Sequence, residues 1–186
     1  MSDNEVKRYS ATDFPAEIFC QTESYIRLIF RAKARGADRF FNLKSITDPM
    51  WHFVICERDM LISHALVRQR TLNHAGETYS LYGVGAVMTH PAFRGEGYGQ
   101  RVVAAATASI CASSADVGML FTYPALETFY GNCGWVHLSD PGIHYGDPAN
   151  PKFENAFTMM VFVSERAKAH RADFDRGPIY VGASRW

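Results

Sequence analysis

A glycine-rich stretch between two apolar segments constrains this chain more than any other feature. It reads Arg94-Gly95-Glu96-Gly97-Tyr98-Gly99-Gln100, follows the apolar run 81–88 and precedes the alanine-rich segment 102–111. This order predicts a strand, a tight loop and a helix, because the glycines allow positive φ and remove Cβ atoms from the turn. Backbone N–H groups can then converge at the positive end of the helix, beside the charge of Arg94, which suits a phosphate or pyrophosphate. A tight connection without a ligand is the alternative.

The spacing of this loop disfavours two common phosphate sites. It has no Gly-Lys-Ser/Thr, which the nucleoside-triphosphate loop requires. Its glycines follow G-x-G-x-G rather than the G-x-G-x-x-G of dinucleotide-binding domains, and the segment 119–121, about 20 residues on, offers no acid for a ribose hydroxyl. We therefore expect a phosphate-bearing cofactor of another kind.

Size and charge limit the classes of partner. A chain of 186 residues, 47% of them hydrophobic, predicts one folded domain over residues 1–186, with a polar C-terminal tail over about 164–186. Lys and Arg together number 19, as do Asp and Glu, so the formal net charge is zero. Nucleic-acid and anionic-membrane partners select a basic excess, so we expect neither. Near-neutrality also permits a homodimer.

The cysteines and the N-terminus indicate a cytoplasmic protein. The four cysteines are widely and irregularly spaced, without a nearby histidine at zinc-ligand spacing, which favours reduced thiols and no metal site. The segment 1–5 is polar and acidic, unlike a signal peptide. No apolar run approaches the roughly 18 residues that span a bilayer.

The apolar pattern predicts hairpins followed by alternating strands and helices, which implies an α/β fold with a mixed sheet and helices on both faces. Expected strands cover 6–10, 51–56, 60–68, 78–88, 117–122, 135–138 and 156–163. Expected helices run from about 12 to a basic end near Gly36, where Arg31, Lys33 and Arg35 face solvent, and over 102–113 and 125–132; a short helix or turn falls near 40–46, and a long loop at 139–152. Gly83 and Gly85 inside a strand mark a bulge, a close approach of a ligand, or a plain bend.

Two motifs together resemble the GNAT N-acetyltransferase superfamily. Arg94-x-x-Gly97-x-Gly99 looks like its acetyl-CoA pyrophosphate loop. The segment 129–135, Phe-Tyr-Gly-Asn-Cys-Gly-Trp, resembles its aromatic-Tyr-x-x-x-Gly-aromatic signature after the fifth strand. The order of elements over about 51–163 fits the family, which implies an α/β (α+β) fold with a mostly antiparallel mixed sheet. Its central strands, here about 84–90 and 117–122, would splay apart.

The resemblance implies acetyl-CoA as the acyl donor, no metal, and direct attack by a primary amine of a small molecule or peptide in a ternary complex. The backbone of Val87 and Thr89 would pair with the pantetheine arm, and an N–H near Met88 would stabilise the carbonyl oxygen. Tyr130 would protonate the leaving thiolate, whose pKa of about 8.5 makes modest assistance sufficient. The pyrophosphate would be held by Arg94, Gly95, Glu96, Gly97, Tyr98, Gly99 and Gln100.

The chain departs from the family pattern at two places. Many members carry an acid on the fourth strand, but 82–86 reads Tyr-Gly-Val-Gly-Ala, so no carboxylate is present to take the amine proton. A chain of waters is the favoured route; the alternative bases are Glu77, Tyr82, His64 and His74. Some members have Asn where this chain has Tyr123, which is therefore not expected to contact the cofactor.

Two further interpretations stay open. An apolar strand followed by a polar tail and Trp186 is similar to the arrangement in aminoglycoside 2'-N-acetyltransferases, in which the end of the chain reaches the acceptor site. This resemblance implies that Trp186 and its carboxylate would bind a polyamine-like acceptor here. The favoured alternative for the tail is a packing arm or a dimer contact. A non-catalytic acyl-CoA-binding regulatory module is the alternative to an enzyme, and Tyr130 favours the enzyme. The acceptor amine has no readable code in the sequence.

Overall fold

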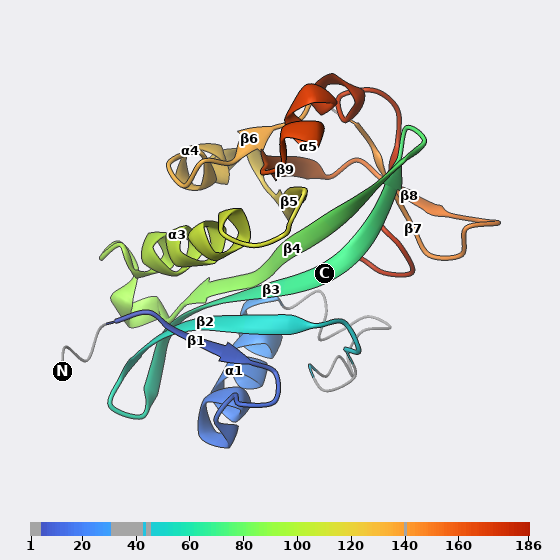
Figure 1. Cartoon of the computed structure of the whole chain (residues 1–186). Helices are drawn as coiled ribbons and strands as arrows, with labels where there is room; N and C mark the ends of the chain where they lie inside the picture. The colour runs from blue at the N-terminus through green and yellow to red at the C-terminus, as the bar shows by residue number, and fades with distance from the viewer. Residues whose placement is uncertain (1–4, 31–42, 44–45, 140) are drawn as a thin grey trace. The chain divides into compact units, whose positions relative to one another are not determined.

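The computed structural model describes residues 5–30, 43, 46–139 and 141–186 (Figure 1). The expected basic helix end with Arg31, Lys33 and Arg35, and most of the expected short helix near 40–46, lie outside these residues. The described strands form a seven-stranded sheet of order β1-β2-β3-β4-β5-β9-β6 and a three-stranded sheet of order β10-β7-β8. Their bounds are β1 Lys7–Ser10, β2 Met50–Glu57, β3 Met60–His74, β4 Glu77–Thr89, β5 Val117–Thr122, β6 Val136–His137, β7 Ile143–Tyr145, β8 Lys152–Glu154, β9 Phe157–Phe162 and β10 Ile179–Tyr180.

The chain divides into two compact units. The first holds Met1–Arg68 and Ala86–Ala106, and the second holds Gln69–Gly85 and Thr107–Trp186. Three elements, β3, β4 and α3, contribute residues to both units. The helices and 3-10 turns are α1 Ala16–Ile29, η3 Pro91–Phe93, α3 Tyr98–Cys111, η4 Pro124–Leu126, α4 Glu127–Gly131, α5 Glu165–Ala169 and η5 Arg171–Asp173.

In the first unit, α1 covers an antiparallel sheet. Strand β2 pairs with β1 on one side and with β3 on the other. Ile26 of α1 is buried with Val54, Leu61 and Met88, and α1 lies against these strands in Figure 1. The helix α1 ends at Ile29, because Phe30 leaves the helical conformation at φ −96° and ψ 60°.

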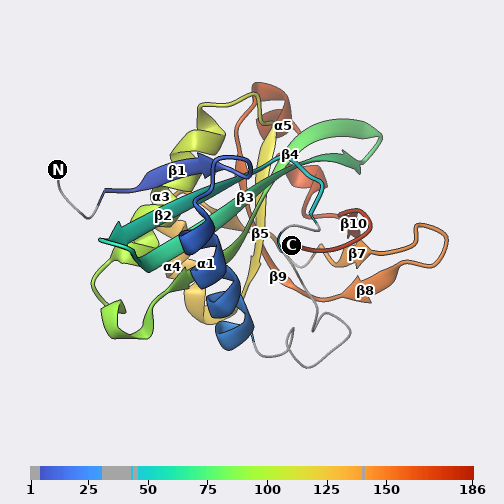
Figure 2. The same ribbon diagram turned by 90° about the horizontal axis from the view of Figure 1, so that it is seen from below.

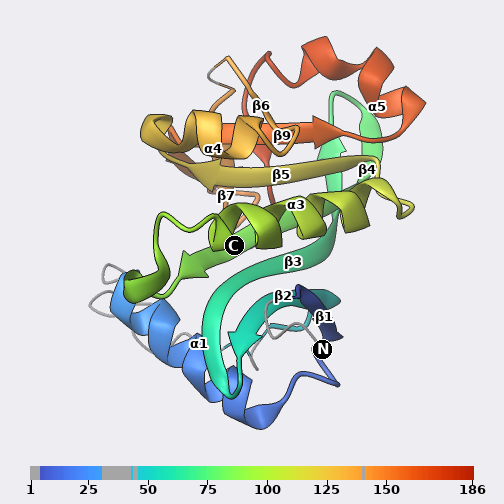
Figure 3. The same ribbon diagram turned by 90° about the vertical axis from the view of Figure 1, so that its left-hand side faces the viewer.

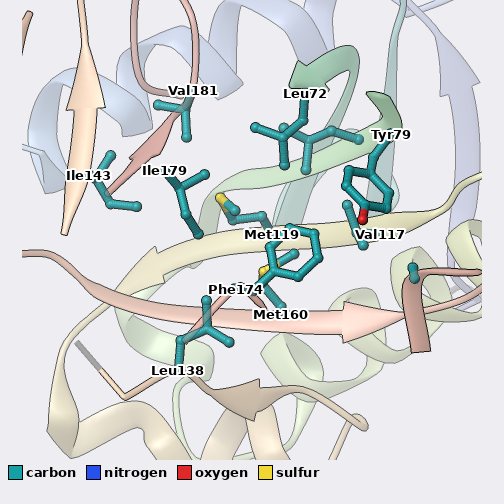
Figure 4. Close-up of a cluster of buried hydrophobic side chains, with 12 residues drawn as sticks. Leu72, Tyr79, Val117, Met119, Leu138, Ile143, Met160, Phe174, Ile179 and Val181 are labelled. Carbon is teal, nitrogen blue, oxygen red and sulfur yellow. The ribbon is translucent and has the colours of Figure 1, made fainter. Parts of the chain in front are cut away.

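In the second unit, β5 lies between β4 and β9. All six residues of β5 pair antiparallel with β9, and the two strands run side by side in Figure 3. Parallel pairs between β4 and β5 are confined to Leu81–Val84 and Val117–Leu120, although both strands continue further. Met119 and Met160 pack with Phe174 and Ile179 in the core of this unit, which Figure 4 shows. The fold class expected from the sequence, a mixed and mostly antiparallel sheet with helices, is confirmed.

The expectation of a long surface loop over 139–152 is wrong, and the list of expected strands, which ended with 156–163, lacked the strands β7, β8 and β10. Strand β7 lies inside the expected loop, β8 begins at its end, and β10 comes from the tail; the three form the small sheet seen in Figure 2. Ile143 and Ile179 pair directly and are both fully buried. Strands of two or three residues have too few positions to show an alternating pattern, so they could not be predicted from the sequence.

Candidate functional site

The glycine loop adopts the conformation that its sequence predicts at two of three positions. Gly95 has φ +87° and Gly97 has φ +80°, and a Cβ at either would meet nothing within 4 Å. Backbone conformation, not crowding, therefore requires glycine at both positions. The expectation of positive φ at Gly99 is wrong, because Gly99 already lies in the first turn of α3.

The N-terminus of α3 opens directly onto this loop. The Arg101 N–H donates to the Gly97 carbonyl at 3.0 Å, which is the first turn of the helix. The N–H groups of residues 98–100 therefore point along the helix axis towards the loop, at the positive end of a 14-residue helix. This arrangement favours an anion over the loop.

Arg94 and His90 fix how the chain enters the loop. The Ala92 N–H donates to Nδ1 of His90 at 3.2 Å, which caps the turn η3. Nε of Arg94 donates to the Thr89 carbonyl at 3.3 Å, so the exposed guanidinium is tethered to the end of β4. A positive charge thus stands at the mouth of the loop.

The end of β4, residues 86–89, and His90 directly after it alternate their backbone groups between two edges. The carbonyls of Ala86 and Met88 accept from His64 Nδ1 at 2.8 Å and from the Ser63 hydroxyl at 3.0 Å. The His90 N–H donates to the Ile62 carbonyl at 2.8 Å. These three residues face β3, so the backbone groups of Val87 and Thr89 face the opposite edge. The Met88 side chain is buried in the core of the first unit.

A buried histidine pair lies beneath this part of β4. Ala86 has φ +46°, an unfavourable left-handed conformation for a residue with a Cβ. His52 Nδ1 and His64 Nε2 lie 3.0 Å apart, and the Phe14 ring stacks on His52 at 3.8 Å between centroids. Burial lowers the pKa of His52 to about 3, with His64 adding to the effect, and burial lowers the pKa of His64 to about 4. Both imidazoles are therefore neutral at pH 7.

Tyr130 lies in α4, within the second unit, and is buried. Burial raises the pKa of Tyr130 to about 12, although a hydrogen bond with the Thr122 hydroxyl partly opposes this. Its carbonyl accepts from the N–H groups of Cys133 and Trp135, at 2.9 and 3.3 Å, and Gly134 turns the chain with φ +89°. The signature 129–135 is thus a compact turn that holds a protonated phenol.

The residues considered as bases are engaged in other contacts. His64 uses both ring nitrogens, on Ala86 and on His52. His74 Nε2 lies 2.9 Å from the Asp173 carbonyl, and its ring stacks on Phe174. Glu77 lies 3.5 Å from Arg166. Tyr82, the remaining candidate base, is buried. Tyr123 is not a candidate base; it stands where some family members have Asn, and it is exposed.

The tail packs on the strand that lacks the acid, as the packing-arm alternative allows, although the sequence did not indicate which strand it meets. A Cβ at Gly83 would stand 2.7 Å from Cδ2 and 2.8 Å from Nε1 of Trp186, and one at Gly85 would stand 3.2 Å from Cδ1. Nε1 of the indole donates to the Val84 carbonyl at 3.1 Å, and the guanidinium of Arg70 lies 5.4 Å from the centre of the Trp186 ring. The two strand glycines therefore make room for an indole of this chain.

Two general features complete the description. In the part of the chain that the structure covers, no group of three or more His, Cys, Asp or Glu side chains could hold a metal ion. Among the same residues, none of the helices has the length and apolarity that crossing a membrane requires.

Comparison with known proteins adds a family and a set of similar folds. Residues 13–138 match the family model of the acetyltransferase (GNAT) domain, which covers more than half of the chain. No curated protein sequence matches the chain. The solved structure of ElaA from Escherichia coli is similar with a TM-score of 0.62 at 15% identity, over 84% of this chain and 98% of that one.

Two other solved structures show the same fold. A GNAT family acetyltransferase from Brucella melitensis, in complex with acetyl-CoA, is similar with a TM-score of 0.61 at 15% identity, over 95% of each chain. A conserved protein of unknown function from Enterococcus faecalis, a probable N-acyltransferase, is similar with a TM-score of 0.55 at 20% identity, over 72% of this chain. The matched region spans only 33% of that longer protein.

Proposed function

We propose that this chain, which belongs to the GNAT acetyltransferase family, transfers the acetyl group of acetyl-CoA to a primary amine of a small molecule or peptide. The observation that carries the proposal is the loop 94–100, with positive φ at Gly95 and Gly97 and the 14-residue helix α3 beginning within it at Tyr98. Such a loop suits a pyrophosphate. The Brucella melitensis protein of the same fold was crystallised with acetyl-CoA, which supports the choice of cofactor.

The cofactor would be held mainly by backbone groups. In our proposal the N–H groups of residues 94–100 bind the pyrophosphate, and the Arg94 guanidinium adds charge. Val87 and Thr89 pair with the pantetheine arm, since their backbone groups face away from β3. The Met88 carbonyl accepts from Ser63, so the backbone groups of Met88 face β3. Val87 is therefore favoured over Met88 as the N–H donor that stabilises the oxyanion.

Tyr130 is the proposed general acid. The amine nitrogen attacks the thioester carbonyl, and the tetrahedral intermediate expels the CoA thiolate as the C–S bond breaks. A pKa of about 12 keeps the phenol protonated at pH 7, so its proton is present when the sulfur leaves. The phenolate then regains a proton from solvent.

The proposed route for the amine proton is through water. His64 has no nitrogen left to accept a proton without losing one of its hydrogen bonds. His74 and Glu77 have partners of their own, at the Asp173 carbonyl and at Arg166. A chain of waters leading to bulk solvent can take up the amine proton without a single catalytic base.

The decisive experiment follows thiol release from acetyl-CoA with a panel of amines. We expect release with at least one amine, and Tyr130→Phe should lower kcat at least tenfold while the Kd of acetyl-CoA stays nearly unchanged. Binding of acetyl-CoA without release on any amine would support the regulatory module instead. A chain that does not bind acetyl-CoA would contradict the proposal entirely.

A further inference from the structure

The buried pair His52 and His64 has no role in the chemistry proposed above. Both rings are almost fully removed from solvent, with exposures of 2% and 0%. Burying two polar rings is costly unless each hydrogen bond is made. The pair ends on the carbonyl of Ala86, which is the residue of β4 with positive φ.

The partners determine where the protons are. A carbonyl oxygen only accepts hydrogen bonds, so Nδ1 of His64 is protonated and donates to the Ala86 carbonyl. Neutral His64 then has Nε2 as an acceptor, and Nδ1 of His52 must donate to it. One arrangement of protons satisfies the whole series, and the lowered pKa values of both histidines agree with it.

This series cannot pass a proton to a substrate. Its last member is a carbonyl, which has no proton to give and is not a base near neutral pH. The series instead controls the direction of a backbone carbonyl. It holds the Ala86 carbonyl towards β3, at the one described residue of β4 whose backbone lies in the left-handed region.

We propose that His64 is a positioning residue for the acyl donor. By holding Ala86, it fixes the irregularity in β4 and so sets the direction of the next backbone groups, those of Val87 and Thr89. Phe14 stacks on His52, and His52 in turn orients His64. The inference rests on the proposed function, because it assigns these backbone groups to the arm of acetyl-CoA.

Two isosteric substitutions separate this role from simple packing. An Asn amide places its N–H₂ near the position of Nδ1, whereas a Gln amide mimics Nε2. His64→Asn therefore keeps a donor for Ala86, and His64→Gln loses it. We expect His64→Gln to weaken acetyl-CoA binding about tenfold, the loss of roughly one hydrogen bond, with a smaller change in kcat. His64→Asn should stay within about threefold of wild type.

His74 provides the matched control. It is also buried and bonded to a carbonyl, that of Asp173, but it lies in the second unit and away from β4 residues 86–89 in the sequence. His74→Ala removes a comparable hydrogen bond, so it tests general destabilisation. We expect the Kd of acetyl-CoA to be unchanged in this variant at temperatures where it is folded.

A readout without ligand keeps the inference separate from the proposed function. Amide chemical shifts and hydrogen exchange at Val87 and Thr89 should change in His64→Gln, and stay near wild type in His64→Asn and His74→Ala. Unaltered amide signals of Val87 and Thr89 in His64→Gln would overturn the inference. So would equal losses of acetyl-CoA affinity in His64→Asn and His64→Gln. If His64→Gln does not fold, His52→Gln removes the same restraint one bond further away and should alter the same amides. Failure of the wild type to bind acetyl-CoA would instead overturn the proposed function.

Discussion

Adding one methyl group at Gly83 should dislodge Trp186 from β4. The new Cβ would lie 2.7 Å from Cδ2 and 2.8 Å from Nε1 of the indole. Both atoms belong to a rigid fused ring, so the ring cannot yield by rotating one end. The whole side chain must move, and the hydrogen bond from Nε1 to the Val84 carbonyl, now 3.1 Å, must lengthen or break.

The expected cost follows from three contributions. Losing the indole hydrogen bond costs about 0.5–1.5 kcal/mol. Overpacking a fitted contact costs about 1–3 kcal/mol. Replacing Gly by Ala returns about 0.4–1 kcal/mol, because the unfolded chain has less conformational freedom. Together these give a net cost of about 0.5–4 kcal/mol, so we expect Gly83→Ala to lower the free energy of unfolding by about 2 kcal/mol.

Urea denaturation measures this free energy, and tryptophan fluorescence reports the environment of the indole. Gly131→Ala is the control, since a Cβ there meets nothing within 4 Å and the position is helical. A double-mutant cycle with Trp186→Ala isolates the contact, because Gly83→Ala should then be neutral or stabilising. The reasoning is refuted if Gly83→Ala costs the same with and without the indole.

The loop and the histidine pair give two further predictions. Arg94→Ala should weaken acetyl-CoA binding at least tenfold by calorimetry, whereas Arg101→Ala, which removes the same charge one turn into α3, should weaken it less than threefold; equal losses would mean that only net charge matters. Acid should destabilise the fold through His52 and His64, whose pKa values of about 3 and about 4 lie below the unfolded value of about 6.5. The unfolded chain takes up these protons first as the pH falls, so stability is lost between about pH 6.5 and 4 through His64 and between about pH 6.5 and 3 through His52, by up to about 1.4 kcal/mol per pH unit for each histidine. Urea melts across this range test it, and a slope no shallower in His64→Asn would contradict it.

Local patterns predicted strand β5 and most of the glycine loop well. Strand β5 has the bounds that its apolar run indicates, and Gly95 and Gly97 have the positive φ that their spacing requires. In both cases the cause lies within a few residues of its effect. An apolar run between turn signals indicates a buried strand, and a glycine pair before a helix marks a tight turn.

Contacts between distant residues were not predictable in the same way. Gly83 and Gly85 suggested a bulge, a bend or a ligand, and the structure places Trp186, about a hundred residues later, on both. The pairing of His52 with His64 depends on the register of β2 and β3, in which His64 lies opposite Val54. A sequence pattern shows which face a side chain takes, but not which partner meets it.

The missing fourth-strand acid follows from the packing of Trp186. A carboxylate side chain at Gly83 or Gly85 would collide with the indole, whereas Tyr82 and Val84 are buried. The segment 82–85 therefore has no position for a hydrated acid, and our proposal sends the amine proton to water. In that case the rise of kcat/KM with pH reports the acceptor itself. Its midpoint should move from about pH 8 for an α-amino acceptor to about pH 10.4 for a lysine side chain. Initial rates for two such peptides decide the matter, because a midpoint near pH 6.5 for both, lost on changing one histidine, would mean that the enzyme supplies a base.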